Sequence, residues 1–522
     1  MLIAGYAALS GRCATAASPP SFSQVLEGLA HEKFGSTLSA AELKIVRTAP
    51  MREVAWVGPD SDPEHPSNDP STGEEWGPER TVRAEVIAWL VTDPACVNYI
   101  HPSGVGVAGA RIQGKIEISY LTASKPITLL RSFIPDGIDL ADAHVDGLEI
   151  DHSKIGPIVA DLAEVSHDVT LMFNAVGPIS LYRSKIGGTF DCTGSRFLAN
   201  GQRALKAVEA TIGGDALFHE GFQTDGIVDF RLAKVGHDLS FNNADFVGND
   251  ANGLNAERAE IAGTFYWVDI GHNAKTMLDL EGASARAFWD DAASWPSPGQ
   301  LTLNGFAYDE LLGGPTDATS RLQWLRLEPA GYWPQPYRQL AKVLRDRGND
   351  GDATDVAIAS LVERRRMGGL DRLERLWNRL LEVTIGYGYR PLRALWWIAG
   401  FVMFGTILFE CGRWLRLIAP TEEVAYEQFV KTGEPPAHYP PFNAFVYSLE
   451  NFLPVVELGQ DPYWRPNPRH SPGGFVHRSA HRLTPGTLPA VVLRWYLWAH
   501  IIAGWMITPL LFAGLSGLVR PD

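Results

Sequence analysis

Residues 140–155 read LADAHVDGLEIDHSKI and carry an apolar residue at every fifth position, namely Leu140, Val145, Ile150 and Ile155. A five-residue unit that turns the chain by a right angle returns it above its own start after four units. Each apolar side chain then points inward, and stacked coils bury one continuous core and pair their strands in parallel. This stretch therefore predicts a β-solenoid with a square coil.

The same pattern runs less regularly over residues 104–306. Short apolar strands recur about ten residues apart, as a stacked coil requires. The period slips at 199–211 and 247–260, where we expect loops or short helices that leave the stack. Further copies of the unit are YRSKI at 182–186, TGSRF at 193–197 and NNADF at 242–246.

The unit, as in DHSKI at 151–155, resembles the repeat of the pentapeptide-repeat family. The resemblance implies a right-handed quadrilateral β-helix. The order of the whole chain is similar to that of bacterial membrane proteins with such a solenoid before two C-terminal spans, a group often labelled membrane-associated oxidoreductases. The expected fold is therefore mainly a β-solenoid with helical caps, followed by an α-helical two-span membrane domain.

Residues 104–109 read GVGVAG, which matches the GxGxxG fingerprint of dinucleotide-binding folds. That fingerprint needs a helix after it, so that the pyrophosphate rests on the helix N-terminus. Residues 110–118 alternate like a strand instead. We therefore interpret these glycines as the first turn of the solenoid and predict no cofactor.

Both ends of the repeat carry helical patterns, as an open solenoid needs caps. Residues 21–103 are expected to form a helical N-terminal cap, with a capping signal at Ser39 and Glu42, a loop at 60–79 and a helix at 79–92. Residues 1–20 are interpreted as a disordered start. Residues 307–390 are expected to hold a helical hairpin, at 335–345 and 353–366, and a basic juxtamembrane helix at 370–383.

Residues 391–522 are expected to form a membrane domain with spans at about 391–411 and 494–519. Both segments are apolar and long enough to cross a bilayer, and aromatic residues such as Trp396 and Trp495 suit its interfaces.

Basic residues set the orientation of the two spans. Arginines are concentrated just before the first span, so the positive-inside rule places the solenoid and both termini in the cytoplasm. The membrane expected to hold the spans is the inner, plasma membrane. The arginines expected to meet anionic membrane lipid are Arg372, Arg375, Arg379, Arg390 and Arg393.

Between the spans, residues 442–453 form an amphipathic helical pattern that Pro454 breaks. This layout is similar to that of two-span tetrameric cation channels, in which Glu450 and Glu457 could form acidic rings in an oligomer. The other interpretation is an interfacial helix that caps the bundle. His500, inside the second span, is the third candidate polar residue.

A filter-like sequence, TIGYG at 384–388, precedes the first span and follows a charged helix. A filter needs a span on both sides, so we interpret these glycines as the stop of the basic helix.

Composition narrows the function. The formal net charge of −15 argues against nucleic-acid binding through a basic face. No catalytic, cofactor or metal motif is found, and the four cysteines read as free thiols in a reducing compartment: Cys13, Cys96, Cys192 and Cys411.

Three functions follow from these observations. The first is a membrane-anchored scaffold whose solenoid binds an unknown cytoplasmic protein. The second is an ion channel made of several copies, with the solenoid as a regulatory domain. The third is the oxidoreductase that the resemblance implies.

Overall fold

The computed structural model describes residues 21–60, 62–247, 253–272, 276–467 and 488–518. The expected disordered start at 1–20 lies outside this part. The chain divides into two compact units, residues 1–353 and 354–522.

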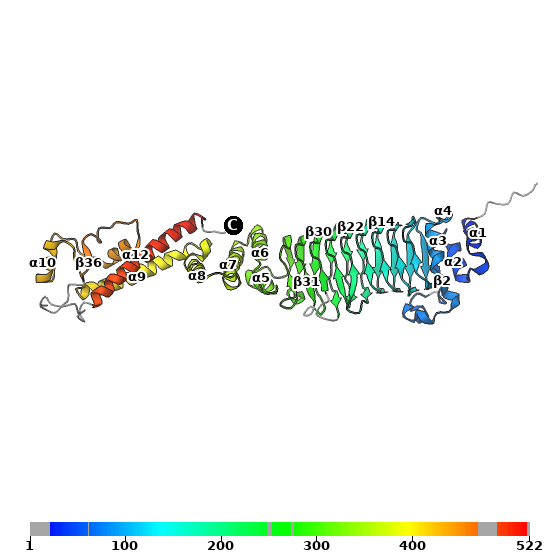
Figure 1. Ribbon diagram of the computed structural model, residues 1–522, viewed down its shortest axis with the longest axis horizontal. Coiled ribbons are helices and arrows are strands. Elements are labelled where there is room, and N and C mark those ends of the chain that lie inside the picture. The colour runs from blue at the N-terminus through cyan, green and yellow to red at the C-terminus, as the bar shows by residue number, and fades with distance from the viewer. Residues whose placement is uncertain (1–20, 61, 248–252, 273–275, 468–487, 519–522) are drawn as a thin grey trace, which may run out of the picture. The chain divides into compact units, whose positions relative to one another are not determined.

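Unit 1 is a parallel β-solenoid of about nine coils, as the repeat predicted (Figure 1). Each regular coil has four short strands, which stack into three sheets. The first sheet contains β1 Val54–Trp56, β3 Val105–Ala108, β6 Thr122–Ala123, β7 Ile127–Leu130, β10 His144–Val145, β11 Leu148–Asp151, β14 Glu164–Val165, β15 Val169–Met172, β18 Lys185–Ile186, β19 Phe190–Asp191, β22 Thr211–Ile212, β23 Ala216–Leu217, β26 Lys234–Val235, β27 Leu239–Ser240, β30 Glu260–Trp267, β32 Ser284–Asp290 and β34 Ala307–Gly313.

The second sheet contains β2 Thr81–Arg83, β4 Arg111–Gln113, β8 Phe133–Ile134, β12 Lys154–Ile155, β16 Ala175–Val176, β20 Arg196–Phe197, β24 Gln223–Thr224 and β28 Asp245–Phe246. The third sheet contains β5 Ile116–Glu117, β9 Ile138–Asp139, β13 Ile158–Val159, β17 Ile179–Ser180, β21 Arg203–Lys206, β25 Ile227–Asp229, β29 Gly253–Asn255, β31 Met277–Asp279 and β33 Leu301–Thr302.

The coil length follows the five-residue unit where the repeat is clean. His144 pairs with Glu164, so that coil has 20 residues, or four units. Lys185 pairs with Thr211, which makes a coil of 26 residues at the first predicted slip. The extra residues do not form a helix there, because the described segment 199–211 consists of turns and β21, which bulges and stays in its sheet.

A ladder of buried polar side chains holds one corner of the solenoid. The backbone N–H of Ser132 donates to Ser153 Oγ (2.9 Å), that of Ser153 to Asn174 Oδ1 (2.7 Å) and that of Asn174 to Ser195 Oγ (2.9 Å). Successive members lie 21 residues apart, so a side chain of each coil accepts the buried backbone N–H of the coil before it.

Helices and short 3₁₀ turns close the N-terminal end of the solenoid. The predicted capping box is confirmed, because Ser39 and Glu42 cap α2 reciprocally. The predicted helix at 79–92 begins only at Ala84, since the residues before it form β2 and pair with β4. These elements are α1 Phe22–Phe34, α2 Ala40–Thr48, α3 Ala84–Thr92 and α4 Pro94–Val97, with 3₁₀ turns at Gly35–Thr37, Pro66–Asn68, Pro70–Glu75 and Pro78–Arg80.

At the other end, α5 Ala318–Leu325 and α6 Pro334–Asp346 follow the last coil, with a 3₁₀ turn at Ala292–Ser294. Asp290 of β32 and Arg321 of α5 form a fully buried bidentate ion pair with both N–O distances at 2.7 Å. The Trp295 indole also donates to Asp290 (2.7 Å). This network fixes α5 on the last coils.

Unit 2 is helical. Two of its helices, α9 and α12, are long and apolar enough to cross a membrane, and they lie side by side (Figure 1). The short helix α11 packs against both, and β35 and β36 form a small antiparallel sheet in the connection. The elements are α7 Asp350–Met367, α8 Arg372–Ile385, η7 Gly386–Gly388, α9 Arg393–Trp414, β35 Ile418–Pro420, α10 Glu423–Thr432, α11 Ala444–Phe452, β36 Trp464–Pro466 and α12 Leu488–Leu515.

The helices lie where the sequence predicted them, but α12 begins at Leu488 and ends at Leu515. The expected spans at 391–411 and 494–519 correspond to α9 and α12, with residue 519 outside the described part, and the amphipathic helix at 442–453 is α11. The glycine stop is also confirmed, because Gly386 ends α8 in the left-handed conformation (φ 54°).

Candidate functional site

His500 lies at the centre of a polar cluster where α9, α11 and α12 meet. Its side chain is 1% exposed. Nε2 lies 3.0 Å from the carbonyl oxygen of Ser448, and Nδ1 lies 3.2 Å from the hydroxyl of Tyr496. A carbonyl oxygen can only accept, so Nε2 carries a proton, and in a neutral ring Nδ1 then accepts from Tyr496. Ser448 Oγ in turn donates to the carbonyl oxygen of Val402 on α9 (2.8 Å).

Two glycines make room for this cluster. A Cβ on Gly405 of α9 would lie 2.3 Å from Ser448 Oγ, and one on Gly504 of α12 would lie 1.7 Å from the carbonyl oxygen of Phe452. Both helices therefore approach α11 closely only because these positions lack side chains, as in other small-residue helix contacts.

Glu450 does not point outward as a free acid. Its carboxylate accepts the backbone N–H groups of Gly459 (3.1 Å), Gln460 (2.6 Å) and Asp461 (3.2 Å). Glu450 thus ties the end of the following loop back to α11. Holding this loop is a different role from the acidic ring of an oligomer, which the sequence analysis considered for Glu450.

Glu457 lies in that loop and is exposed. Its neighbours Val455 and Leu458 are also exposed, by 86% and 46%. The structure thus gives the three candidate polar residues separate places: His500 of α12 contacts Ser448 of α11, Glu450 of α11 binds the following loop, and Glu457 lies exposed in that loop.

The arginines before α9 fall into two groups. Arg365 donates to Glu382 (2.5 Å) and Arg390 to Asp355 (2.5 Å), so these two neutralise carboxylates within unit 2. The others of the predicted lipid-facing set are exposed and form no ion pair among the described residues: Arg372, Arg375, Arg379 and Arg393.

The turn η7 between α8 and α9 is buried and polar. The hydroxyl of Tyr387 donates to Asn378 Oδ1 (2.6 Å) and lies 3.3 Å from the Arg365 guanidinium. Burial raises the pKa of Tyr387 to about 12, so it remains a neutral hydroxyl. These contacts hold the chain where it turns from α8 into α9.

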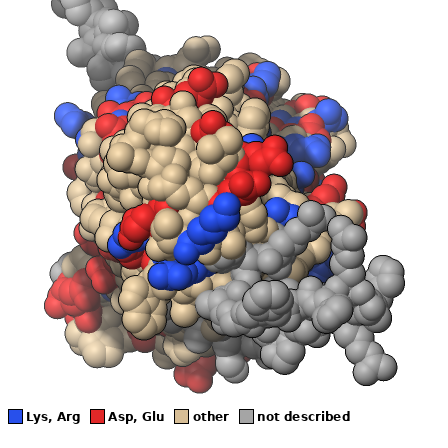
Figure 2. All heavy atoms as spheres, turned by 90° about the vertical axis from the view of Figure 1, so that its left-hand side faces the viewer, with Lys and Arg blue, Asp and Glu red and all other residues tan. Residues whose placement is uncertain are grey.

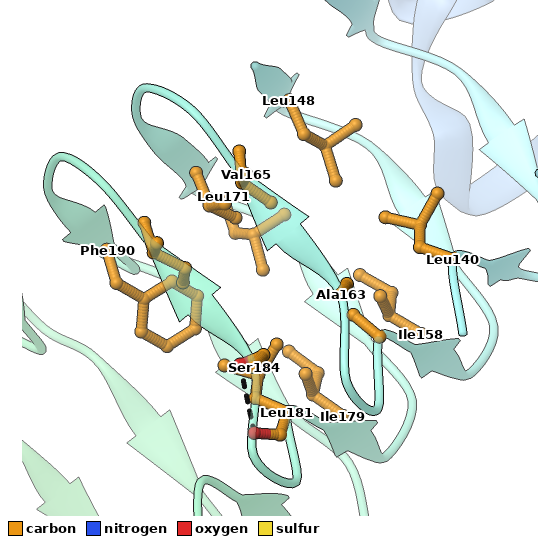
Figure 3. Close-up of a pocket in the computed structure, with 13 residues that line it drawn as sticks. Leu140, Leu148, Ile158, Ala163, Val165, Leu171, Ile179, Leu181, Ser184 and Phe190 are labelled. Atoms are coloured by element: carbon orange, nitrogen blue, oxygen red, sulfur yellow. Dashed lines mark hydrogen bonds between the residues drawn. The ribbon is translucent and has the colours of Figure 1, made fainter. Parts of the chain in front are cut away.

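The interior of the described part of the solenoid is closely packed around one small apolar void. The space between its middle coils is a void of about 10 Å³ with an apolar lining that includes Leu148, Leu171, Ile179 and Phe190 (Figure 3). Such a void holds at most one water and offers it almost no polar partner.

Two open grooves lie on the solenoid surface. One, of about 470 Å³, includes Asp215, Asp238 and Tyr266. Its carboxylates join neighbouring coils, because Asp215 accepts the backbone N–H of Asp238 (2.9 Å) and Asp238 accepts that of Thr264 (2.6 Å). The other, of about 500 Å³, lies between residues 64–71 and the corner at Arg131, His152 and Phe173.

The GVGVAG stretch belongs to the solenoid. Gly104 and Gly109 take positive φ values at the two ends of β3, which pairs with β1 and β7. The glycines thus belong to a turn of the solenoid, as expected, but not to its first one, because β1 and β2 stack before β3 and β4. No helix follows this stretch directly, since β4 comes next. Among the described residues, no group of three or more His, Cys, Asp or Glu side chains could hold a metal ion.

Sequence reasoning missed Ser448 and Tyr496. Tyr496 precedes His500 by four residues and therefore shares its helix face, which is a signal that the sequence carries. Ser448 is the one serine in the predicted amphipathic helix, but its partner His500 lies 52 residues away. Comparison of the chain with family models, curated proteins and solved structures found no significant match.

Proposed function

We propose that this protein is a membrane-anchored scaffold, in which α9 and α12 cross the bilayer and the solenoid binds a protein partner on the cytoplasmic side. The observation that carries the membrane part is the uncovered apolar surface of both helices. Exposed fractions reach 82% at Trp396, 58% at Ile407, 62% at Trp505 and 64% at Phe512.

These side chains recur on one face of each helix, and the opposite faces pack on α11 and on each other. A soluble monomer rarely exposes a continuous apolar patch of more than a few hundred Å². A bilayer removes this surface from water without any further partner.

Helix α8 supports the proposed orientation. It exposes Leu373 (76%), Leu376 (67%) and Trp377 (51%) beside Arg372 and Arg379. An apolar stripe flanked by arginines is the pattern of a helix that lies in an anionic interface.

The opposite end of unit 2, over α10 and the β35–β36 sheet, shows charged side chains of both signs among uncharged residues (Figure 2). The concentration of unpaired arginines therefore favours the α8 end as the cytoplasmic one.

The solenoid offers a corner ridge for a partner. Tyr120, Leu162 and Leu232 are exposed by 76%, 50% and 45%, and all three adopt positive φ at equivalent corners. Bulky residues are disfavoured in that conformation, and Asn or Gly would suit it better. Large apolar side chains that are exposed in this disfavoured conformation support a contact surface.

Two experiments test this proposal. Alkaline carbonate should leave the full-length protein in the membrane pellet, and release into the supernatant would refute the anchor. For the scaffold, cross-linking of the full chain in native membranes should lose its protein adducts when Tyr120, Leu162 and Leu232 are all changed to Asn. The control Leu198→Asn, at an exposed site off this ridge, should keep them; equal adducts in both would refute the ridge.

A further inference from the structure

The loop after α11 begins at the middle of the proposed membrane layer. The last residue of α11, Phe452, stacks on Phe401, with ring centroids 5.5 Å apart. Phe401 is the ninth residue of the 22 in α9, which is about 33 Å long at 1.5 Å per residue. Phe452 also touches Gly504, near the middle of α12. Helix α11 thus enters from the connection side and ends about halfway along both spans.

From there the chain returns to the side from which it came. Gln460 Oε1 accepts the N–H of Asn443, the residue that caps the start of α11. Residues 453–459 therefore run back alongside α11, and the three hydrogen bonds to Glu450 fix their far end. The segment is held as a re-entrant loop.

This loop carries unsatisfied backbone groups. Within the described residues, the carbonyl oxygens from Pro454 to Gly459 accept no hydrogen bond, and the N–H groups of Val455, Glu457 and Leu458 donate none. In hydrocarbon, each such group costs several kcal/mol, so non-helical backbone at this depth occurs only where protein or a water-filled cavity covers it. The exposed carboxylate of Glu457 is equally unsuited to lipid.

We propose that residues 454–459 face other copies of this chain around a water-filled path, whose lining of carbonyl oxygens and Glu457 carboxylates accepts cations. The inference rests on the membrane insertion proposed above. Rotational symmetry brings the same loop of each copy to one axis, so the unsatisfied backbone groups of all copies face the same path. Water in that path supplies hydrogen bonds to the unsatisfied N–H and carbonyl groups alike, and the carbonyl oxygens from Pro454 to Gly459, together with the Glu457 carboxylate, are the groups that attract cations.

Cysteine accessibility tests the path directly. In full-length protein with Cys13 and Cys411 changed to Ser, Val455→Cys should react with a charged, membrane-impermeant thiosulfonate. The matched control is Met403→Cys, which lies at similar depth on the exposed face of α9 and is 55% exposed. We expect the loop cysteine to react at least about tenfold faster, because the reactive thiolate forms in water and not in hydrocarbon.

The outcomes separate the two proposals. Protection of Val455→Cys equal to that of Met403→Cys overturns the water-filled path. A particle of one 57.2 kDa chain in mild detergent, with no disulfide between Val455→Cys copies in native membranes, overturns the self-association. Fast reaction of Met403→Cys instead refutes the membrane placement itself, which carbonate release would show independently.

Ion flux tests the role of the carboxylate. In proteoliposomes of the full-length protein, Glu457→Gln should reduce potassium flux relative to unchanged protein, because the path loses one negative charge per copy. Flux that is absent in both, or equal in both, overturns cation passage through this lining.

Discussion

The contact between Gly504 and Phe452 makes a sharp test of the helical unit. A Cβ added at Gly504 would lie 1.7 Å from the carbonyl oxygen of Phe452, whereas real Cβ contacts hardly ever fall below 3.0 Å. The change Gly504→Ala therefore forces α11 and α12 apart by roughly 1 Å. At Gly400 of α9, an added Cβ meets nothing within 4 Å, so Gly400→Ala is the matched control.

The expected cost combines two effects. Overpacking costs about 1–3 kcal/mol, and separating the helices weakens the contact of His500 with Ser448, a membrane hydrogen bond of about 0.6 kcal/mol. Alanine returns up to about 1 kcal/mol through helix propensity. A net loss of about 1–3 kcal/mol lowers the midpoint by roughly 2–4 °C per kcal/mol in a unit of this size.

Gly504→Ala should therefore lower the thermal midpoint in detergent by about 2–12 °C, measured by fluorescence-detected size exclusion after heating. Gly400→Ala should leave the midpoint unchanged or raise it slightly. Equal midpoints for Gly504→Ala and Gly400→Ala would refute the close packing of α11 against α12.

Three further predictions concern charged groups. Asp290→Asn leaves the buried Arg321 without a counter-charge and should cost the solenoid about 3–5 kcal/mol in urea unfolding; a loss below 1 kcal/mol would contradict the pair. Burial raises the pKa of Glu328 to about 7 from 4.5, so its contribution to stability is full below pH 4.5 and is lost as pH rises to about 7. Glu328→Gln should remove this part of the pH dependence of the unfolding free energy, and an unaltered pH profile would contradict it. Glu450→Ala should free the loop for limited proteolysis while the exposed-site control Glu457→Ala should not, and equal cleavage rates would contradict the tie.

The solenoid could be predicted because its signal is local and repeated. Every fifth residue, as in Leu140 and Val145, reports the same inward position, so a few irregular coils do not hide the pattern. The strands β1 and β2 gave no such signal. They are three residues long and are strands only because they pair with β3 and β4, far away in sequence. Strand character of this kind comes from tertiary context.

In the helical unit, too, the sequence predicts some features, and others depend on packing. Apolar length revealed α9 and α12, and periodicity revealed α11, because both properties belong to one segment. The partner of His500 is not such a property, since Ser448 lies on another helix and its carbonyl oxygen leaves no mark in the sequence. A hydrogen bond to backbone depends on which helix turn faces the ring, and therefore on the packing.

The two acids show how far a residue type alone determines a role. Glu450 and Glu457 are alike in sequence, and both suited an acidic ring. The structure uses Glu450 to hold three backbone N–H groups, and a carboxylate engaged in this way is not available to line a path. The Glu457 carboxylate accepts no hydrogen bond among the described residues, and the backbone carbonyl oxygens beside it accept none either. If the spans are in lipid, the bound acid holds the loop in place, and the free acid and its neighbouring carbonyl oxygens are the groups that need water or another copy of the chain.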